Sequence, residues 1–451
     1  MRAGISIFRR HWPLLAGMGL LAAGAAGLVL HQSVAAPART ESEARRFVHL
    51  ALVFERIRPG EVDAWFGPRQ LSLPAITDPK DADELAVALG MLSADLAVRG
   101  EGADERRRTR LRERLGRLRT SVDLVRSTGR PMPFAQEAQR LYAIDLTGTE
   151  READWRRVRT ELDGMLPGKG TLAERSERYF KRFIVPSALR ERVFTLALAE
   201  CRKRTLSQWP LPGNETVDIE WTTAVPAAWH RYRGKMQSTI QINPDAVAFP
   251  GQAIDVACHE GYPGHHAQFV AMEVAEGPAG SFVEDRLVML RSPETAIREG
   301  AADAGVEIAF PSQDRIAFLR DVLFPAASLN PAEALRYARI ESLVRRLSGA
   351  ALPILARYRD EKISRHEASL ALREDALLSS PEALLDYTDR FGAYATGYTI
   401  ARNKVKGGLT LDCGSGWLGL RRLAERPDIL LAGLEARQTT NAHRMIQKEK
   451  L

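Results

Sequence analysis

Apolar residues recur at helical spacing along most of this chain. The first apolar helix face is formed by Phe47, Leu50, Ala51, Phe54 and Ile57. The turn Arg58-Pro59-Gly60 is predicted to end this helix. The same periodicity predicts further helices over residues 82–98, 104–125, 189–196, 336–347, 367–378 and 381–405. The pattern therefore predicts a mostly α fold.

Two short segments alternate apolar and polar residues and predict a minor β element. Val217–Trp221 and Ser238–Ile242 show this alternation, and the turn residues Arg233-Gly234-Lys235 lie between them. We expect a small hairpin or sheet just before a histidine-rich segment. The strand around Ile240 either adds an extended peptide to its edge or supports the helix that follows.

The chain is predicted to divide at the turn Pro167-Gly168-Lys169-Gly170. This boundary gives an N-terminal helical region, residues 38–167, and a second helical region, residues 168–451, that holds the histidine-rich segment. The alternative is one continuous domain over residues 38–451. The sequence gives no basis for an oligomeric state.

The N-terminus has the pattern of an export signal. Arg2, Arg9 and Arg10 precede an uncharged apolar stretch over residues 12–30, and small residues follow at 33–38. Residues 1–37 are predicted to be a signal peptide or an N-terminal membrane anchor, because the apolar stretch is about long enough to span a bilayer. Both alternatives place the remaining chain outside the cytoplasmic membrane, in the periplasm or its equivalent. The membrane is expected to contact the chain only through this segment.

Composition and charge limit the class of protein and the partners that can be expected. The 451 residues are 45% hydrophobic and 27% charged with a net charge of +7, as in ordinary globular proteins. An arginine-rich run at 106–119 alternates with leucines and predicts a solvated helix face. It lacks aromatic residues for base stacking, so no nucleic-acid partner is expected. The three cysteines lie far apart and predict no disulfide framework, with Cys258 a buried small residue.

The strongest chemical signal is the segment His259-Glu260-Gly261-Tyr262-Pro263-Gly264-His265-His266. In the zincin pattern HExxH, two histidines four residues apart bind zinc and the glutamate activates water. Here the spacing is longer, and seven helical residues would separate the imidazoles by about 10 Å. Pro263 and Gly264 predict a bend that brings His265 or His266 back to His259.

A third ligand is expected from a second helix. Glu299, Asp303 and Glu307 recur at four-residue spacing among small residues. Glu299 is predicted to bind metal, while Asp303 hydrogen-bonds a ligand histidine. Asp255 competes for that supporting role, and an exposed polar stripe is the alternative for Asp303 and Glu307.

These residues resemble the bacterial metallopeptidase family called "domain of unknown function 885", whose signature is HE-x-x-PGH. Residues 259–268 fit the signature throughout, and the resemblance covers roughly residues 43–440. Glu299-Gly300 is similar to the family's EGW segment, with Ala301 in place of its tryptophan. Tyr398-Thr399-Ile400-Ala401 is similar to its Tyr-Lys-Ile-Gly segment, with Thr399 in place of lysine. Val62–Pro68 is also similar to family sequence.

The resemblance implies a large helical, zincin-like body in which His259, His265 and Glu299 bind Zn²⁺ and Glu260 is the general base. His266 then contacts substrate or completes packing. Tyr398 is a candidate hydrogen-bond donor to a developing oxyanion, or a core aromatic residue. We expect an exported zinc-dependent metallopeptidase acting on peptides. The alternatives are a zinc hydrolase of another amide or ester, and a non-catalytic, membrane-tethered scaffold protein.

Overall fold

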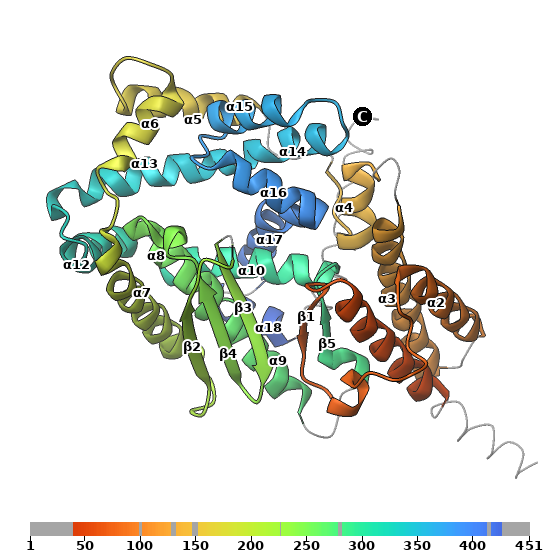
Figure 1. Cartoon of the computed structure of the whole chain (residues 1–451). Helices are drawn as coiled ribbons and strands as arrows, with labels where there is room; N and C mark the ends of the chain where they lie inside the picture. Colours follow the sequence, from red (N-terminus) through yellow and green to blue (C-terminus); the bar gives the residue numbers. More distant parts are fainter. Residues whose placement is uncertain are drawn as a thin grey trace, which may run out of the picture.

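The computed structural model describes residues 39–98, 102–127, 132–146, 152–225, 227–277, 282–412 and 416–425. The fold is mostly α with two small sheets, which confirms the predicted fold class (Figure 1). The expected signal peptide or anchor, residues 1–37, lies outside the described residues. Within the described ranges, no helix has the length and apolarity that a membrane crossing requires.

The N-terminal helices form a layer of their own. Residues 39–57 are helical and pack with α2 (Ala82–Ala97) and α3 (Gly102–Arg126) around a shared apolar cluster. The layer is joined to the rest of the chain by β1 (Val62–Trp65), which pairs antiparallel with β5 (Leu287–Met289). This pairing carries the N-terminal layer to the start of the central helix α10 (Pro293–Ala309).

The arginine-rich helix α3 is not a uniformly solvated face, so that prediction is wrong for two of its residues. Arg107 is buried, and its guanidinium donates to both carboxylate oxygens of Glu284 at 2.8 Å. Arg108 is also buried and pairs with Glu43. Buried guanidinium groups require such partners, so these arginines tie α3 to neighbouring elements.

The remaining helices lie around α10 or in a layer that Figure 1 shows above it. They are α4 (Phe134–Tyr142), α5 (Glu152–Met165), α6 (Leu172–Lys181), α7 (Ser187–Gln208), α8 (Pro250–Val256), α9 (His265–Glu276), α11 (Ser312–Phe318), α12 (Phe324–Ala326), α13 (Ala334–Arg346), α14 (Ala351–Arg359), α15 (Arg365–Asp375), α16 (Pro381–Phe391), α17 (Arg402–Asp412) and α18 (Gly416–Glu425). Leu162 and Leu172, on opposite sides of the turn at 167–170, belong to one buried apolar cluster with the residues around the histidine motif.

The helix predicted over 381–405 is broken in the structure. Gly392 has a positive φ of 61° and ends α16. A 3-10 turn, η8 (Gly392–Thr396), and a π-helical turn, η9 (Gly397–Ala401), separate α16 from α17. The left-handed backbone at Gly392 is readily available only to glycine. The break points the tyrosines of this segment toward α10.

The central sheet has the order β2-β4-β3, with β2 (Thr216–Trp221), β3 (Ala228–Gly234) and β4 (Gln237–Ile242). The two predicted strands do lie side by side, but they pair in parallel rather than as a hairpin. The hairpin partner of β4 is β3, which the sequence pattern missed. Because β4 is central, both of its edges are occupied, so the strand around Ile240 supports the motif helix and adds no peptide.

Candidate metal centre

The histidine motif forms a helix that breaks and restarts. After α8, a π-helical turn, η3 (Ala257–Gly261), carries His259, and α9 begins at His265. A Cβ on Gly264 would lie 1.7 Å from the carbonyl oxygen of His259, so only glycine permits this close return of the chain. The predicted bend is confirmed, and it brings the ring centroids of His259 and His265 to 4.8 Å.

The second element of the centre is α10. Ser292 caps its N-terminus by accepting from the backbone N–H of Thr295, and Pro293 occupies its first turn. A Cβ on Gly300 would lie 2.6 Å from the backbone of Ala401 and Arg402. The absence of a side chain at 300 therefore lets η9 and α17 pack directly on α10 beside Glu299.

Three predicted ligands meet between these elements. His259 Nε2 lies 3.2 Å from Glu299 Oε2, and His265 Nε2 lies 3.2 Å from Glu299 Oε1. One potential ligand atom from each of the three residues lies within 4.8 Å of the other two. On its other side, His259 donates from Nδ1 to Asp303 Oδ1 at 2.9 Å.

This donor set fits a zinc ion. Two imidazoles and one carboxylate are a known catalytic zinc set, which leaves a fourth position open. Zinc bonds of about 2.0–2.1 Å place tetrahedral ligands about 3.3 Å apart, close to the two 3.2 Å distances between Glu299 and the histidines, and all three ligand atoms lie within 4.8 Å of one another. The carboxylate of Asp303 behind His259 completes the carboxylate–histidine arrangement typical of zinc ligands.

The charges in this cluster are strongly coupled. Burial raises the pKa of Glu299, but His265 and His259 outweigh it and hold that pKa well below its usual range. Burial lowers the pKa of His259, and Asp303 and Glu299 outweigh it and raise the pKa well above 6.5. The pKa of His265 is also raised, against burial, chiefly by Glu299. The carboxylates therefore stabilise positive charge on the two imidazoles.

Glu260 lines a small cavity of about 50 Å³ together with the three candidate ligands. Among the described residues, no side chain or backbone group hydrogen-bonds its carboxylate. Burial raises the pKa of Glu260, and the nearby histidines His259 and His265 offset part of this rise. A carboxylate that is free of structural partners and faces the metal cluster is placed to accept a proton.

The same cavity contains an acid that sequence reasoning did not select. Asp63 of β1 lines this cavity together with residues of the motif, and burial raises the pKa of Asp63 to about 6. Asp63 belongs to the segment Val62–Pro68, whose family-like sequence was the available signal. Only the pairing of β1 with β5 brings it to the site.

Tyrosines from the broken C-terminal segment cover the centre. Tyr394, which sequence reasoning missed, donates to Glu299 Oε1 at 2.6 Å. Tyr398 also lines the cavity, with its ring centroid 6.0 Å from that of His259, and its hydroxyl lies 3.3 Å from that of Tyr387. Burial and Glu299 raise the pKa of Tyr398 well above 10. Tyr398 is therefore a neutral hydroxyl facing the site. The signal for Tyr394 was its position four residues before Tyr398.

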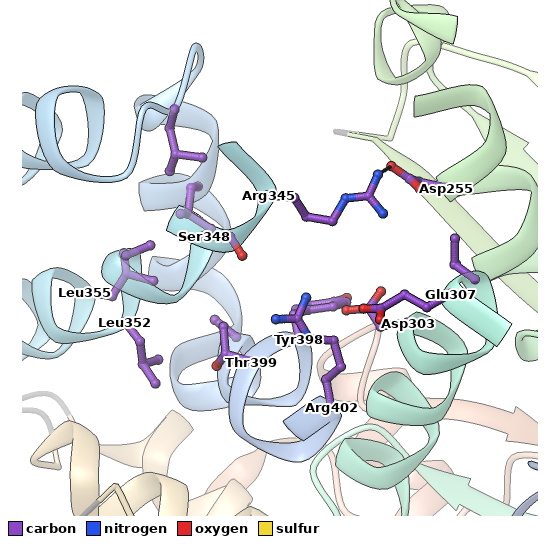
Figure 2. Close-up of a pocket in the computed structure, with 15 residues that line it drawn as sticks. Asp255, Asp303, Glu307, Arg345, Ser348, Leu352, Leu355, Tyr398, Thr399 and Arg402 are labelled. Carbon is purple, nitrogen blue, oxygen red and sulfur yellow. Dashed lines mark hydrogen bonds and ion pairs between the residues drawn. The ribbon is translucent and has the colours of Figure 1, made fainter. Parts of the chain in front are cut away.

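A larger cavity of about 380 Å³ adjoins the centre and shares Tyr398 with the smaller one. Asp303 also lines this larger cavity, and Glu307 lies one turn further along α10 (Figure 2). Glu307 pairs with Lys406 at 2.6 Å and contacts none of the candidate ligands. Of the predicted acidic stripe, Glu299 and Asp303 belong to the centre and Glu307 does not.

His266 is not part of the metal cluster. It is fully buried, donates from Nε2 to Glu215 Oε2 at 2.9 Å, and accepts at Nδ1 from Ser238 Oγ at 2.8 Å. Tyr262 also donates to Glu215, at 2.5 Å. The sequence left open whether His265 or His266 joins His259. The tertiary packing places His266 in a closed hydrogen-bonded cluster and leaves His265 beside His259.

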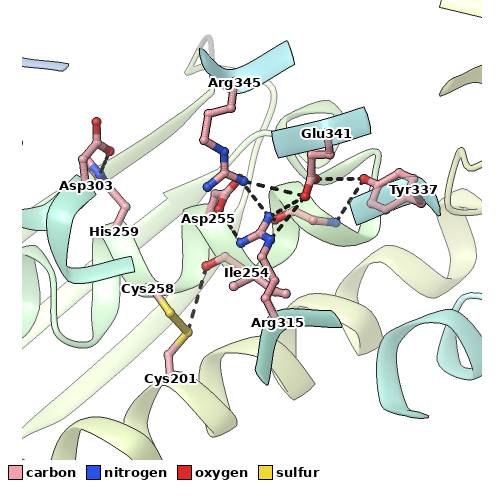
Figure 3. A network of polar contacts seen from close by, with 11 residues as sticks. Cys201, Ile254, Asp255, Cys258, His259, Asp303, Arg315, Tyr337, Glu341 and Arg345 are labelled. Atoms are coloured by element: carbon pink, nitrogen blue, oxygen red, sulfur yellow. Dashed lines mark hydrogen bonds and ion pairs between the residues drawn. A yellow bond between two sulfur atoms is a disulfide. The ribbon is translucent and has the colours of Figure 1, made fainter. Parts of the chain in front are cut away.

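Asp255 serves a different network, so it does not compete with Asp303. Its carboxylate accepts from Arg315 at 2.8 Å and from Arg345 at 2.6 Å, and Arg315 also donates to Glu341 (Figure 3). Burial raises the pKa of Asp255, but the two arginines outweigh it and lower that pKa. This network fixes α8 against α11 and α13 one turn before His259.

The structure overturns the prediction that the cysteines form no disulfide, although Cys258 is buried as expected. Cys258, next to His259, forms a disulfide with Cys201 of α7 (Figure 3). The 57-residue separation gave no sequence signal for this pairing. The bond joins η3 to α7. Arg202, which follows Cys201 in α7, donates to Glu215 at 2.5 Å. The helix that carries the motif is therefore covalently fixed to its neighbour.

No family model and no curated protein matches this chain. Two solved structures are similar to it. One is a presumed lipoprotein from Colwellia psychrerythraea, which is 13% identical to this chain. The match covers 79% of this chain and 71% of that chain, with a TM-score of 0.45. The other is a presumed lipoprotein of unknown function from Shewanella oneidensis, with 11% identity, 76% and 72% covered, and a TM-score of 0.35. Similarity at this level carries no argument about function.

Proposed function

We propose that this chain is a zinc-dependent hydrolase that cleaves peptide bonds outside the cytoplasmic membrane. One observation carries the proposal: ligand atoms of His259, His265 and Glu299 lie within 4.8 Å of one another beside the free carboxylate of Glu260. A structural histidine cluster would have no need of an unpaired glutamate facing a cavity. Asp303 supports the assignment because it orients His259 from behind.

In this proposal His259, His265 and Glu299 hold the ion. A bound zinc ion would polarise the scissile carbonyl and make a water molecule more acidic. Glu260 accepts the proton of the attacking water and then passes it to the leaving amine. The hydroxyl of Tyr398 donates a hydrogen bond to the oxygen on which negative charge develops. Tyr394 restrains the carboxylate of Glu299.

Two independent features support an extracytoplasmic site of action. The first is the charged, apolar and small-residue pattern of residues 1–38. The second is the disulfide between Cys201 and Cys258, since such bonds persist mainly in oxidising compartments. The substrate is accordingly proposed to be an exported or extracellular peptide.

The test combines metal analysis with one conservative substitution. The purified protein should contain close to one zinc ion per chain and hydrolyse members of a peptide library. Glu260→Gln should keep the zinc and lose about 10²- to 10⁴-fold in turnover, because only the proton acceptor is removed. Full activity in Glu260→Gln would rule out this mechanism. A chain that binds no zinc even when zinc is supplied would favour the non-catalytic scaffold, and activity on esters alone would favour the other hydrolase.

A further inference from the structure

The cavity of about 380 Å³ beside the metal centre has two unlike sides. Its apolar side is formed by Ala351, Leu352, Leu355, Leu378, Leu384 and Ala395. The opposite side carries charged groups from α10 and α17, with Arg402 beside Tyr398 and Asp303, and Leu352 and Leu355 across the cavity (Figure 2). Such a cavity suits an amino-acid residue that has an apolar side chain and a charged group on its backbone.

The charged residues of this cavity differ in how well they are paired. They are Asp255, Asp303, Glu307, Arg345 and Arg402. Asp303 is bound to His259, Glu307 to Lys406, and Arg345 to Asp255. Among the described residues, Arg402 forms no ion pair, and its Nε is buried without a hydrogen-bond partner. A buried guanidinium N–H without an acceptor is costly, so this side chain lacks an anionic partner.

The position of Arg402 relates it to the proposed chemistry. Its backbone packs on Gly300, next to the candidate ligand Glu299. Tyr398, one helical turn earlier, lines both this cavity and the small cavity of the metal centre. A peptide with its reacting carbonyl at the candidate ligands would extend past Tyr398 and place its next residue in the larger cavity.

We propose that Arg402 binds the free C-terminal carboxylate of the substrate, with the terminal side chain on the leucine-lined side. This inference rests on the proposed peptide hydrolysis and gives it a direction: the bond cleaved is the one that releases an apolar C-terminal residue. An arginine suits this role because its planar fork of donors matches a carboxylate. The paired state of Asp303 and Glu307 limits their repulsion of the incoming anion.

The experiment uses the full-length, zinc-loaded protein and two matched peptides. They are an N-acetylated tripeptide that ends in leucine with a free carboxylate, and the same peptide with a C-terminal amide. The free acid should have a kcat/KM about 10- to 100-fold higher than the amide, as expected for loss of a charge-assisted hydrogen bond. Arg402→Gln should remove this preference by slowing hydrolysis of the acid alone. Replacement of the terminal leucine by aspartate should also slow hydrolysis.

The matched control is Arg339→Gln. Arg339 is an exposed arginine that lines the neighbouring groove and not this cavity. This variant should retain the preference for the acid. Equal hydrolysis of acid and amide by the parent protein would overturn the proposal. An equal loss for both peptides in Arg402→Gln would also overturn it, because the arginine would then have only a structural role.

A binding measurement separates this proposal from the proposed function. The two peptides are titrated by calorimetry into zinc-loaded Glu260→Gln, and into the same variant with Arg402→Gln added. Binding of the acid but not the amide, lost with Arg402→Gln, would support the subsite even if the parent hydrolysed neither peptide. Equal affinity for acid and amide would refute the subsite even if the parent were an active peptidase.

Discussion

Two clusters built from the same kinds of side chain flank the start of α9. The metal cluster consists of His259, His265, Glu299 and Asp303, and the closed cluster consists of His266, Glu215, Tyr262 and Ser238. In the closed cluster, both nitrogens of His266 and the facing oxygen of Glu215 have hydrogen-bond partners. In the metal cluster, the potential ligand atoms converge on one point and border a cavity.

The surroundings of a histidine–carboxylate pair therefore determine its role. Burial raises the pKa of Glu215, but hydrogen bonds from His266, Tyr262 and Arg202 lower it to about 2. This carboxylate is fully used in holding α9 to α7 and the central sheet. The carboxylate of Glu299 faces two imidazoles, one from η3 and one from α9, an arrangement that could hold a metal ion.

The strongest test of this comparison replaces each of the two neighbouring histidines, His265 and His266, by alanine. His265→Ala should abolish zinc binding, because only two protein ligands remain. His266→Ala should keep zinc but lower the free energy of unfolding by about 3–5 kcal/mol, since a cavity replaces the buried ring and Glu215 and Ser238 each lose one hydrogen-bond partner. Plasma mass spectrometry and urea denaturation of the two variants measure these outcomes. Loss of zinc in His266→Ala with retention in His265→Ala would reverse the assignment of the clusters.

The disulfide connects the two clusters and gives a smaller expected effect. Cys258 precedes the candidate ligand His259, and Cys201 precedes Arg202, which donates to Glu215. The double substitution Cys201→Ala and Cys258→Ala should cost about 2–4 kcal/mol of stability, the usual contribution of a native disulfide. Thermal denaturation with and without a reductant measures this cost. The reductant should lower the Tm of the parent and leave that of the double variant unchanged; equal sensitivity of both would contradict the assignment.

The smallest predicted effect is a difference in zinc affinity between variants of Asp303 and of Glu307, one turn along α10. Asp303→Asn should weaken zinc binding by about 10- to 100-fold, as expected when the carboxylate behind a ligand histidine is lost. Glu307→Gln, one turn along α10, should leave zinc affinity unchanged because Glu307 contacts Lys406 instead. Titration against a competing chelator measures both affinities. Equal affinities in the two variants would remove Asp303 from the metal cluster.

Much of the candidate site could be predicted because its residues are close in sequence or share a helix face. The motif at 259–266 required a bend at Pro263 and Gly264, and four-residue spacing placed Glu299 and Asp303 on one face of α10. By contrast, Asp63 and Tyr394 reach the centre through strand pairing and a broken helix. The spacing of Tyr394 from Tyr398 and the family-like segment around Asp63 are local signals, but neither signal shows that these residues contact the centre.

The helical character of the chain and the small set of candidate metal ligands could be predicted from local spacing alone. The tertiary structure decided which of His265 and His266 faces the cluster, that Asp303 rather than Asp255 supports His259, and that Cys201 and Cys258 are joined. It also decided that the two predicted strands run in parallel. These choices depend on contacts between residues far apart in the chain, where partners are selected by packing and by the need to satisfy buried polar groups.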